Sequence, residues 1–178
     1  MKTMVQFGCG GNILPGWRNH DMEVDITKPL PYGDNSVSRI YIEHCLEHVN
    51  SAQMLGFMKE SLRILEPGGA IRIVFPDCMR ILALADDDYI RFIESSKWSV
   101  PGAGATGTFL AIGSCHGHQQ LLTPEIVTMA LISSGFNCVK SSDLFHSSVP
   151  EFCNICGHWK VIGKHFFEIE SVAMEAFK

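Results

Sequence analysis

The chain has no uninterrupted run of 18 apolar residues, although 46% of its 178 residues are hydrophobic. A helix that crosses a bilayer needs about 20 such residues, so the sequence predicts no membrane span. Lys2 is not followed by the apolar stretch of a secretory leader. We therefore expect a globular protein that has no membrane partner.

Positive charge is also sparse. The chain has 14 Lys and Arg against 19 Asp and Glu, a formal net charge of −5, and no segment concentrates the basic residues. Nucleic-acid binding depends mainly on neutralising phosphates with Lys and Arg. The composition therefore favours a small-molecule or protein substrate and predicts no nucleic-acid partner.

The cysteines lack the pattern of a disulfide framework. There are seven, an odd number, spread through segments expected to be strands and helices, so a reducing cytoplasm is the simplest setting. Cys153 and Cys156 form a C-x-x-C beside His158, and residues 115–118 read CHGH, but a strong zinc signal needs two paired knuckles. We expect buried thiols and well under one zinc per chain. A zinc-stabilised protein is the alternative.

The expected strands and helices fit one domain over residues 1–178, because no repeat or linker divides the chain. Apolar patterning predicts strands at 4–7, 17–22, 37–42, 70–75, 136–140 and 171–177. It predicts helices over 54–65 with Asn50 as N-cap, over 78–96, and from Pro124 to Gly135. Residues 99–117 contain five glycines and no periodicity, which predicts a loop used as a lid or for binding.

The first strand ends in glycines, since residues 5–11 read VQFGCGG, and acidic residues follow at 21 and 25. Glycine lets a ligand lie against bare backbone, and a following carboxylate can accept hydrogen bonds from a ribose. A tight turn is the alternative. Only ten residues separate Gly10 from Asp21, and Pro15 and Gly16 lie among them, so no full crossover helix fits.

Three further segments follow in order: DNSV at 34–37, EHCLEHV at 43–49 and LEPGGAIRI at 65–73. With the glycine segment, they resemble the class I S-adenosylmethionine-dependent methyltransferases, closely over residues 4–80 and in outline beyond. The resemblance implies an α/β fold, a Rossmann-like, mostly parallel sheet with flanking helices, whose first crossover helix is here shortened or absent. It also implies S-adenosyl-L-methionine as cofactor.

The same resemblance implies roles for eight residues. Gly8, Cys9 and Gly10 would form a backbone cradle, and Asp21 would accept hydrogen bonds from both ribose hydroxyls. Asp25 and Ile26 would approach the adenine amino group and ring face. Glu43 and His44 would contact the methionine part of the cofactor. For Asp21, the alternative is a surface or capping position.

His44 and His48 are four residues apart, with Glu47 between them, a spacing that can form a metal pair on a helix. Zinc proteases place a Glu immediately after the first His, and this chain does not. The sequence therefore predicts no metal ligand here.

Methyl transfer from a sulfonium needs alignment of the reacting atoms more than a nucleophilic residue. A general base is needed only where the acceptor keeps its proton. His44, His116 and His118 are candidates, and the sequence assigns none of them and names no acceptor. A non-catalytic binding module of the same fold that has lost cofactor binding is the competing hypothesis.

Overall fold

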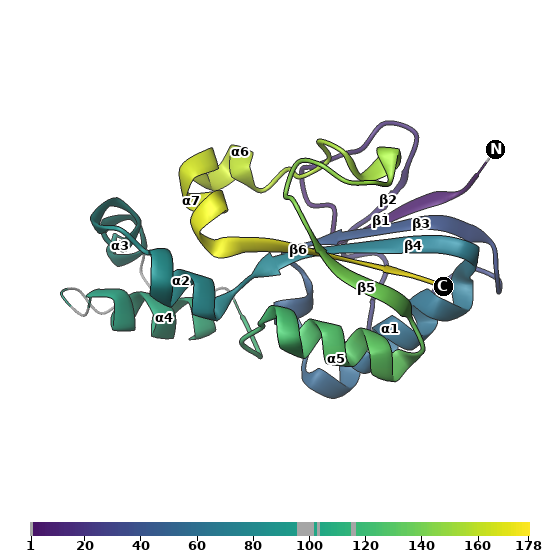
Figure 1. The fold of residues 1–178 in the computed structure, drawn as a ribbon, viewed down its shortest axis with the longest axis horizontal. Coiled ribbons are helices and arrows are strands. Elements are labelled where there is room, and N and C mark those ends of the chain that lie inside the picture. Colours follow the sequence, from purple (N-terminus) through teal and green to yellow (C-terminus); the bar gives the residue numbers. More distant parts are fainter. Residues whose placement is uncertain (1, 96–101, 103, 115–116) are drawn as a thin grey trace.

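Six strands form one sheet, in the order β2-β1-β3-β4-β6-β5, in the computed structural model (Figure 1). The structure describes residues 2–95, 102, 104–114 and 117–178. The first four strands run parallel: β1 (Met4–Phe7), β2 (Arg18–His20), β3 (Val37–Glu43) and β4 (Leu65–Pro76). β6 (Ser171–Phe177) is antiparallel to both β4 and β5 (Asn137–Ser142). The expected mostly parallel α/β sheet is confirmed.

Two helices cover one face of this sheet, α1 (Ser51–Ile64) and α5 (Pro124–Ser134) (Figure 1). Asn50 and Gln53 form the capping box expected at the start of α1, and Thr123 caps α5, which ends at Gly135 with a φ of 101°. Alternate strand residues point to this face and form the main core with both helices; they include Val5, Phe7, Ile40, Ile42, Ile71, Ile73 and Phe75. Burying such a side chain stabilises the fold by about 1.5–3 kcal/mol.

The opposite face is covered by the chain that follows β5. We call residues 143–163 the covering segment; it contains η2 (Pro150–Phe152) and α6 (Trp159–Ile162), and α7 (Lys164–Glu170) follows it. Tyr41 and Val74 of the sheet pack there with Cys156 and with Leu14 of the β1–β2 connection. That connection is a loop with no helix, as the sequence predicts.

Three helices extend beyond the carboxyl ends of the parallel strands (Figure 1): α2 (Cys78–Leu84), α3 (Asp87–Glu94) and α4 (Gly104–Ser114). Ile81, Tyr89, Ile112 and Ile169 form a second, smaller core among them and α7. The helix expected over 78–96 is therefore two helices. The break lies at Asp86, whose side chain caps α3 by accepting a hydrogen bond from the Tyr89 amide.

The prediction of a loop over residues 99–117 is wrong for the part of that segment that forms α4. The glycines predicted irregular chain, but burial of Ala111 and Ile112 against α2 and α3 favours a helix there, and packing outweighs propensity. Residues 96–101, 103 and 115–116 lie outside the described part of the chain. None of the described helices is long and apolar enough to cross a bilayer.

Candidate functional site

A cavity of about 800 Å³ opens at the carboxyl ends of β1, β3 and β4. The sheet side contributes residues 8–12, Glu43, His44, Glu47, His48 and Pro76. The helices α3 and α4 contribute Phe92, Ile93 and Ile112, the chain before α5 contributes His118, and the covering segment with α7 contributes residues 157–158, 160–162 and Glu170. Open α/β sheets bind ligands at this edge, and small-molecule sites commonly enclose about 300–1,000 Å³.

Residues 8–11, which we call the glycine loop, line the cavity at the end of β1. Gly8 and Gly10 have φ values of 65° and 47°, which side chains rarely adopt. A Cβ on Gly8 would lie 2.9 Å from Cys45 Sγ, whereas a Cβ on Gly10 would meet no atom within 4 Å and would project into open space. The Cys9 amide donates to the His20 carbonyl at 2.9 Å, which holds the loop against β2. Bare backbone thus faces the cavity here.

Glu43, at the end of β3, binds the covering segment. Its carboxylate accepts hydrogen bonds from the Gly157 amide at 2.8 Å and the His158 amide at 3.2 Å. Burial raises the pKa of Glu43, and these amides oppose that rise. Asn12 Nδ2 donates to the Ile155 carbonyl at 2.9 Å. The covering segment is therefore joined to both the glycine loop and β3, a link that no local sequence signal indicates.

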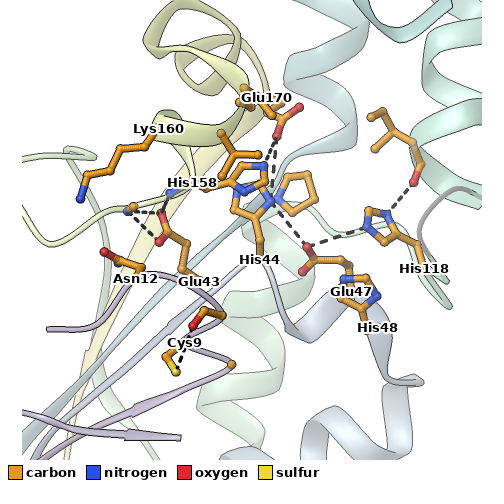
Figure 2. Close-up of a pocket in the computed structure, with 18 of the residues that line it drawn as sticks. Cys9, Asn12, Glu43, His44, Glu47, His48, His118, His158, Lys160 and Glu170 are labelled. Carbon is orange, nitrogen blue, oxygen red and sulfur yellow. Dashed lines mark hydrogen bonds and ion pairs between the residues drawn. The ribbon is translucent and has the colours of Figure 1, made fainter. Parts of the chain in front are cut away.

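His44 lies at the centre of a row of histidines and glutamates. Its φ is 46°, and it precedes the short helix η1 (Leu46–His48). Figure 2 shows interactions that run from Glu170 through His44 and Glu47 to His118. His44 Nε2 lies 2.8 Å from Ser171 Oγ, and its Nδ1 lies 3.6 Å from Glu47 Oε1 and 3.9 Å from Glu170 Oε1.

Burial governs the charges in this row. It lowers the pKa of His44 well below its usual value, and neighbouring histidines, His158 first, lower it further. Burial raises the pKa of Glu47 to about 8, and the charge of Glu170 adds to that rise. His44 is therefore a neutral imidazole at pH 7, able to accept a proton or bind a cation.

Of the eight residues that the sequence analysis assigned, the cavity brings together Gly8, Cys9, Gly10, Glu43 and His44. Asp21, Asp25 and Ile26 are not among its lining residues. Asp25 Oδ1 accepts hydrogen bonds from Thr27 at 2.7 and 2.9 Å, and Ile26 is part of the main core. Asp21 is exposed, but it lies near the loop, because burial raises the pKa of the Cys9 thiol and the charge of Asp21 adds to that rise. The cofactor roles of all eight remain predictions.

His118 is a candidate base from the sequence that the structure does place in the cavity, whereas His116 lies outside the described residues. The thiols of Cys153 and Cys156 donate hydrogen bonds to different backbone carbonyls. Cys153 Sγ donates to the Ser147 carbonyl at 3.4 Å, and Cys156 Sγ donates to the Leu144 carbonyl at 2.9 Å.

Residues 6–73 match the sequence model of a methyltransferase domain family. This span contains the glycine loop and the EHCLEHV segment, so the resemblance seen in the sequence is confirmed there. No curated protein matches the sequence.

Among solved structures, a SAM-dependent methyltransferase from Archaeoglobus fulgidus superposes with a TM-score of 0.58 and 14% identity, over 99% of this chain and 86% of its own. A geranyl diphosphate C-methyltransferase from Streptomyces coelicolor superposes with a TM-score of 0.55 and 14% identity, over 99% of this chain and 69% of its own. A phosphoethanolamine N-methyltransferase from Haemonchus contortus superposes with a TM-score of 0.56 and 12% identity, over 100% of this chain and 49% of its own. This chain therefore spans about half the length of that protein. At these identities the likeness establishes the fold.

Proposed function

We propose that this chain, whose residues 6–73 match a methyltransferase domain and whose fold is that of S-adenosylmethionine-dependent methyltransferases, binds that cofactor and methylates a small-molecule or protein acceptor. The observation that carries the proposal is the glycine loop, which opens into a cavity of about 800 Å³ at the carboxyl ends of the parallel strands.

The residues present fit the cofactor at the loop. Open space lies where a Cβ of Gly10 or Gly11 would project, so a ligand can approach the backbone there. Gly8, Cys9 and Gly10 would hold its amino-acid part, and Asp21 its ribose. The cofactor, when bound, supplies a methyl group on a sulfonium that already carries the activation.

The chain's own contribution is to align the acceptor and to exclude water. Phe92, Ile93 and Ile112 add apolar surface to a lining that also includes the polar side chains of His44, Glu47 and His118. An acceptor that must lose a proton would meet a neutral imidazole at His44, although a pKa so far below pH 7 makes it a weak base. Positioning therefore carries most of the expected rate enhancement.

The competing hypothesis, a non-catalytic binding module, is favoured by two observations. No helix follows the glycine loop, so the amides of a helix N-terminus are missing beside the cradle. The carboxylate of Glu43, a residue that lines the cavity, also already accepts hydrogen bonds from the covering segment.

Titration of the purified protein with S-adenosylhomocysteine and with adenosine separates the two hypotheses. A ligand at about 100 times its dissociation constant stabilises the folded state by roughly 2.7 kcal/mol, so we expect an upward melting shift of several degrees with S-adenosylhomocysteine. Adenosine should give a smaller shift because it lacks the amino-acid part. No shift and no titration heat with either compound would favour the non-catalytic module.

Gly10→Ala and Gly16→Ala make a matched pair for this test. Both glycines have positive φ, 47° and 82°, and at neither would a Cβ meet an atom within 4 Å. The two variants therefore carry similar backbone strain, but only Gly10 lines the cavity. We expect S-adenosylhomocysteine affinity to fall in Gly10→Ala and to hold in Gly16→Ala. Equal affinity in both variants would refute the prediction that Gly10 belongs to a backbone cradle for the cofactor.

A further inference from the structure

Two groups of metal-ligating side chains face the cavity. Among the described residues, His44, His158 and Glu170 form one group, and Glu47, His48 and His118 form the other; within each, one ligating atom per residue lies within 4.8 Å of the others. No pattern in the sequence joins residue 118 to the EHCLEHV segment. The structure does so because Gln119 and Gln120 bond to backbone carbonyls of η1, which brings the chain before α5 against it.

Glu47 is the residue whose buried carboxylate a bound cation would stabilise. Its side chain is 1% exposed, and within the described part of the chain neither carboxylate oxygen has a hydrogen-bond partner. The nearest basic atoms are His44 Nδ1 at 3.6 Å and His118 Nε2 at 4.0 Å. A buried carboxylate without a partner is costly, and proteins resolve the cost by a proton, an ion pair or a metal.

His118 is oriented as a metal ligand would be. Its Nδ1 lies 2.6 Å from the Ile112 carbonyl, which can only accept, so Nδ1 carries the hydrogen. In the neutral ring, Nε2 then presents its lone pair on the side of Glu47. Ligating histidines commonly hold their other ring nitrogen in this way, which fixes the tautomer and the ring plane.

The first group is less suited to a metal because of how its two imidazole rings lie. The rings of His44 and His158 are stacked, 4.0 Å apart and 22° from parallel. Stacked rings direct their nitrogens side by side rather than toward one point.

We propose that Glu47, His48 and His118 bind one divalent metal ion, with zinc as the ion that best matches two imidazoles and one carboxylate. Three ligands from the described residues would leave a fourth position of a tetrahedral ion open, as in zinc sites that bind a water or a substrate. All three residues line the cavity, so the open position would face it. An acceptor with an oxygen or nitrogen donor could bind there; this last step rests on the proposed function, and the metal site does not.

The test uses the full chain, stripped with a chelator, dialysed and titrated with zinc chloride against a competing chromogenic chelator. We expect one zinc per chain, in place of the well under one zinc per chain that the sequence predicts. Glu47→Gln, which keeps the shape and removes the charge, and His118→Gln should each weaken affinity about 10–100-fold or more. His146→Gln, at an exposed histidine, should leave it unchanged, and Glu170→Gln, in the other group, should change it far less than Glu47→Gln does.

Zinc X-ray absorption on the wild-type protein keeps the proposal testable even if a variant misfolds. We expect nitrogen and oxygen neighbours at about 2.0–2.1 Å, whereas capture by a cysteine such as the exposed Cys138 would give sulfur at about 2.3 Å. A sulfur shell, no binding, or binding lost in Glu170→Gln and kept in Glu47→Gln would each overturn the proposal. S-adenosylhomocysteine binding is measured separately, so failure of the metal site and failure of the proposed function give different results.

Discussion

Arg72→Ala should destabilise the protein more than most single substitutions, because Arg72 is fully buried and holds three parts of the chain together. Its guanidinium lies 2.5 Å from Glu175 Oε1 of β6 and donates to Ser142 Oγ at 3.0 Å. It also donates to the carbonyls of Asp143 and Leu144 at 2.5 and 2.9 Å, where the covering segment begins.

Breaking a buried ion pair by removing one partner costs about 3–5 kcal/mol, since the other charge is left in the interior. The lower end applies here because Glu175 keeps some compensation. Its Oε1 still accepts from Ser142 at 3.0 Å, and its Oε2 lies 3.8 Å from Lys140 Nζ. We therefore expect a loss of about 3 kcal/mol, and at about 2–4 °C for each kcal/mol a fall in melting temperature of roughly 6–12 °C.

Urea unfolding followed by circular dichroism measures this loss. The control is Arg72→Met combined with Glu175→Leu, which removes both charges and should recover most of the stability, because an apolar pair can replace a buried ion pair at little cost. A loss below about 1 kcal/mol for Arg72→Ala, against the roughly 3–5 kcal/mol typical of such pairs, would refute the reasoning. So would a double variant that is less stable than Arg72→Ala alone.

Three further predictions concern the cavity. Asp21→Ala should weaken S-adenosylhomocysteine binding by roughly 1.5–3 kcal/mol in calorimetry, the value of a hydrogen bond to a charged group, and unchanged affinity with a loss in Asp25→Ala would move the ribose contact to Asp25. Gly157→Ala should displace the covering segment, because its Cβ would lie 2.2 Å from Asn12 Cγ; we expect a lower melting temperature and weaker cofactor binding, and wild-type values for both would contradict it. In chelated protein, stability should fall as pH rises from about 4.5 to about 8, because the raised pKa of Glu47 means that the folded state binds the proton that the unfolded chain has lost. The slope approaches about 1.4 kcal/mol per pH unit and should flatten in Glu47→Gln, so an equal slope in both, measured by urea unfolding, would argue against it.

The sequence predicts the fold well where signals are local. The strands at 4–7 and 171–177 coincide with β1 and β6, Asn50 caps α1 as expected, and α5 begins at Pro124 as expected. The ten residues between Gly10 and Asp21 also predict a connection without a helix. In each case the deciding chemistry lies within a few residues of its effect.

The errors and omissions arise where distant segments meet. α4 is helical although its glycines favour a loop, because its apolar residues pack on α2 and α3. Five of the eight predicted site residues share the cavity because one sheet edge gathers them. Nothing near residues 43 or 47 indicates Gly157 or His118, which reach them through long connections.

The place of β6 in the sheet bears on how the protein is made. β6 is the last strand in sequence, yet it lies between β4 and β5, and it gives β5 its partner in the sheet. During synthesis, β5 can therefore have no place in the sheet until residue 177 has left the ribosome. Until then the edge of β4 has no partner strand and can pair with a wrong segment, and Arg72 has no ion-pair partner in Glu175. Arg72, which holds residues 143 and 144 of the covering segment, is paired with Glu175 only after that strand arrives, so competence to bind a ligand should be among the last properties the nascent chain acquires.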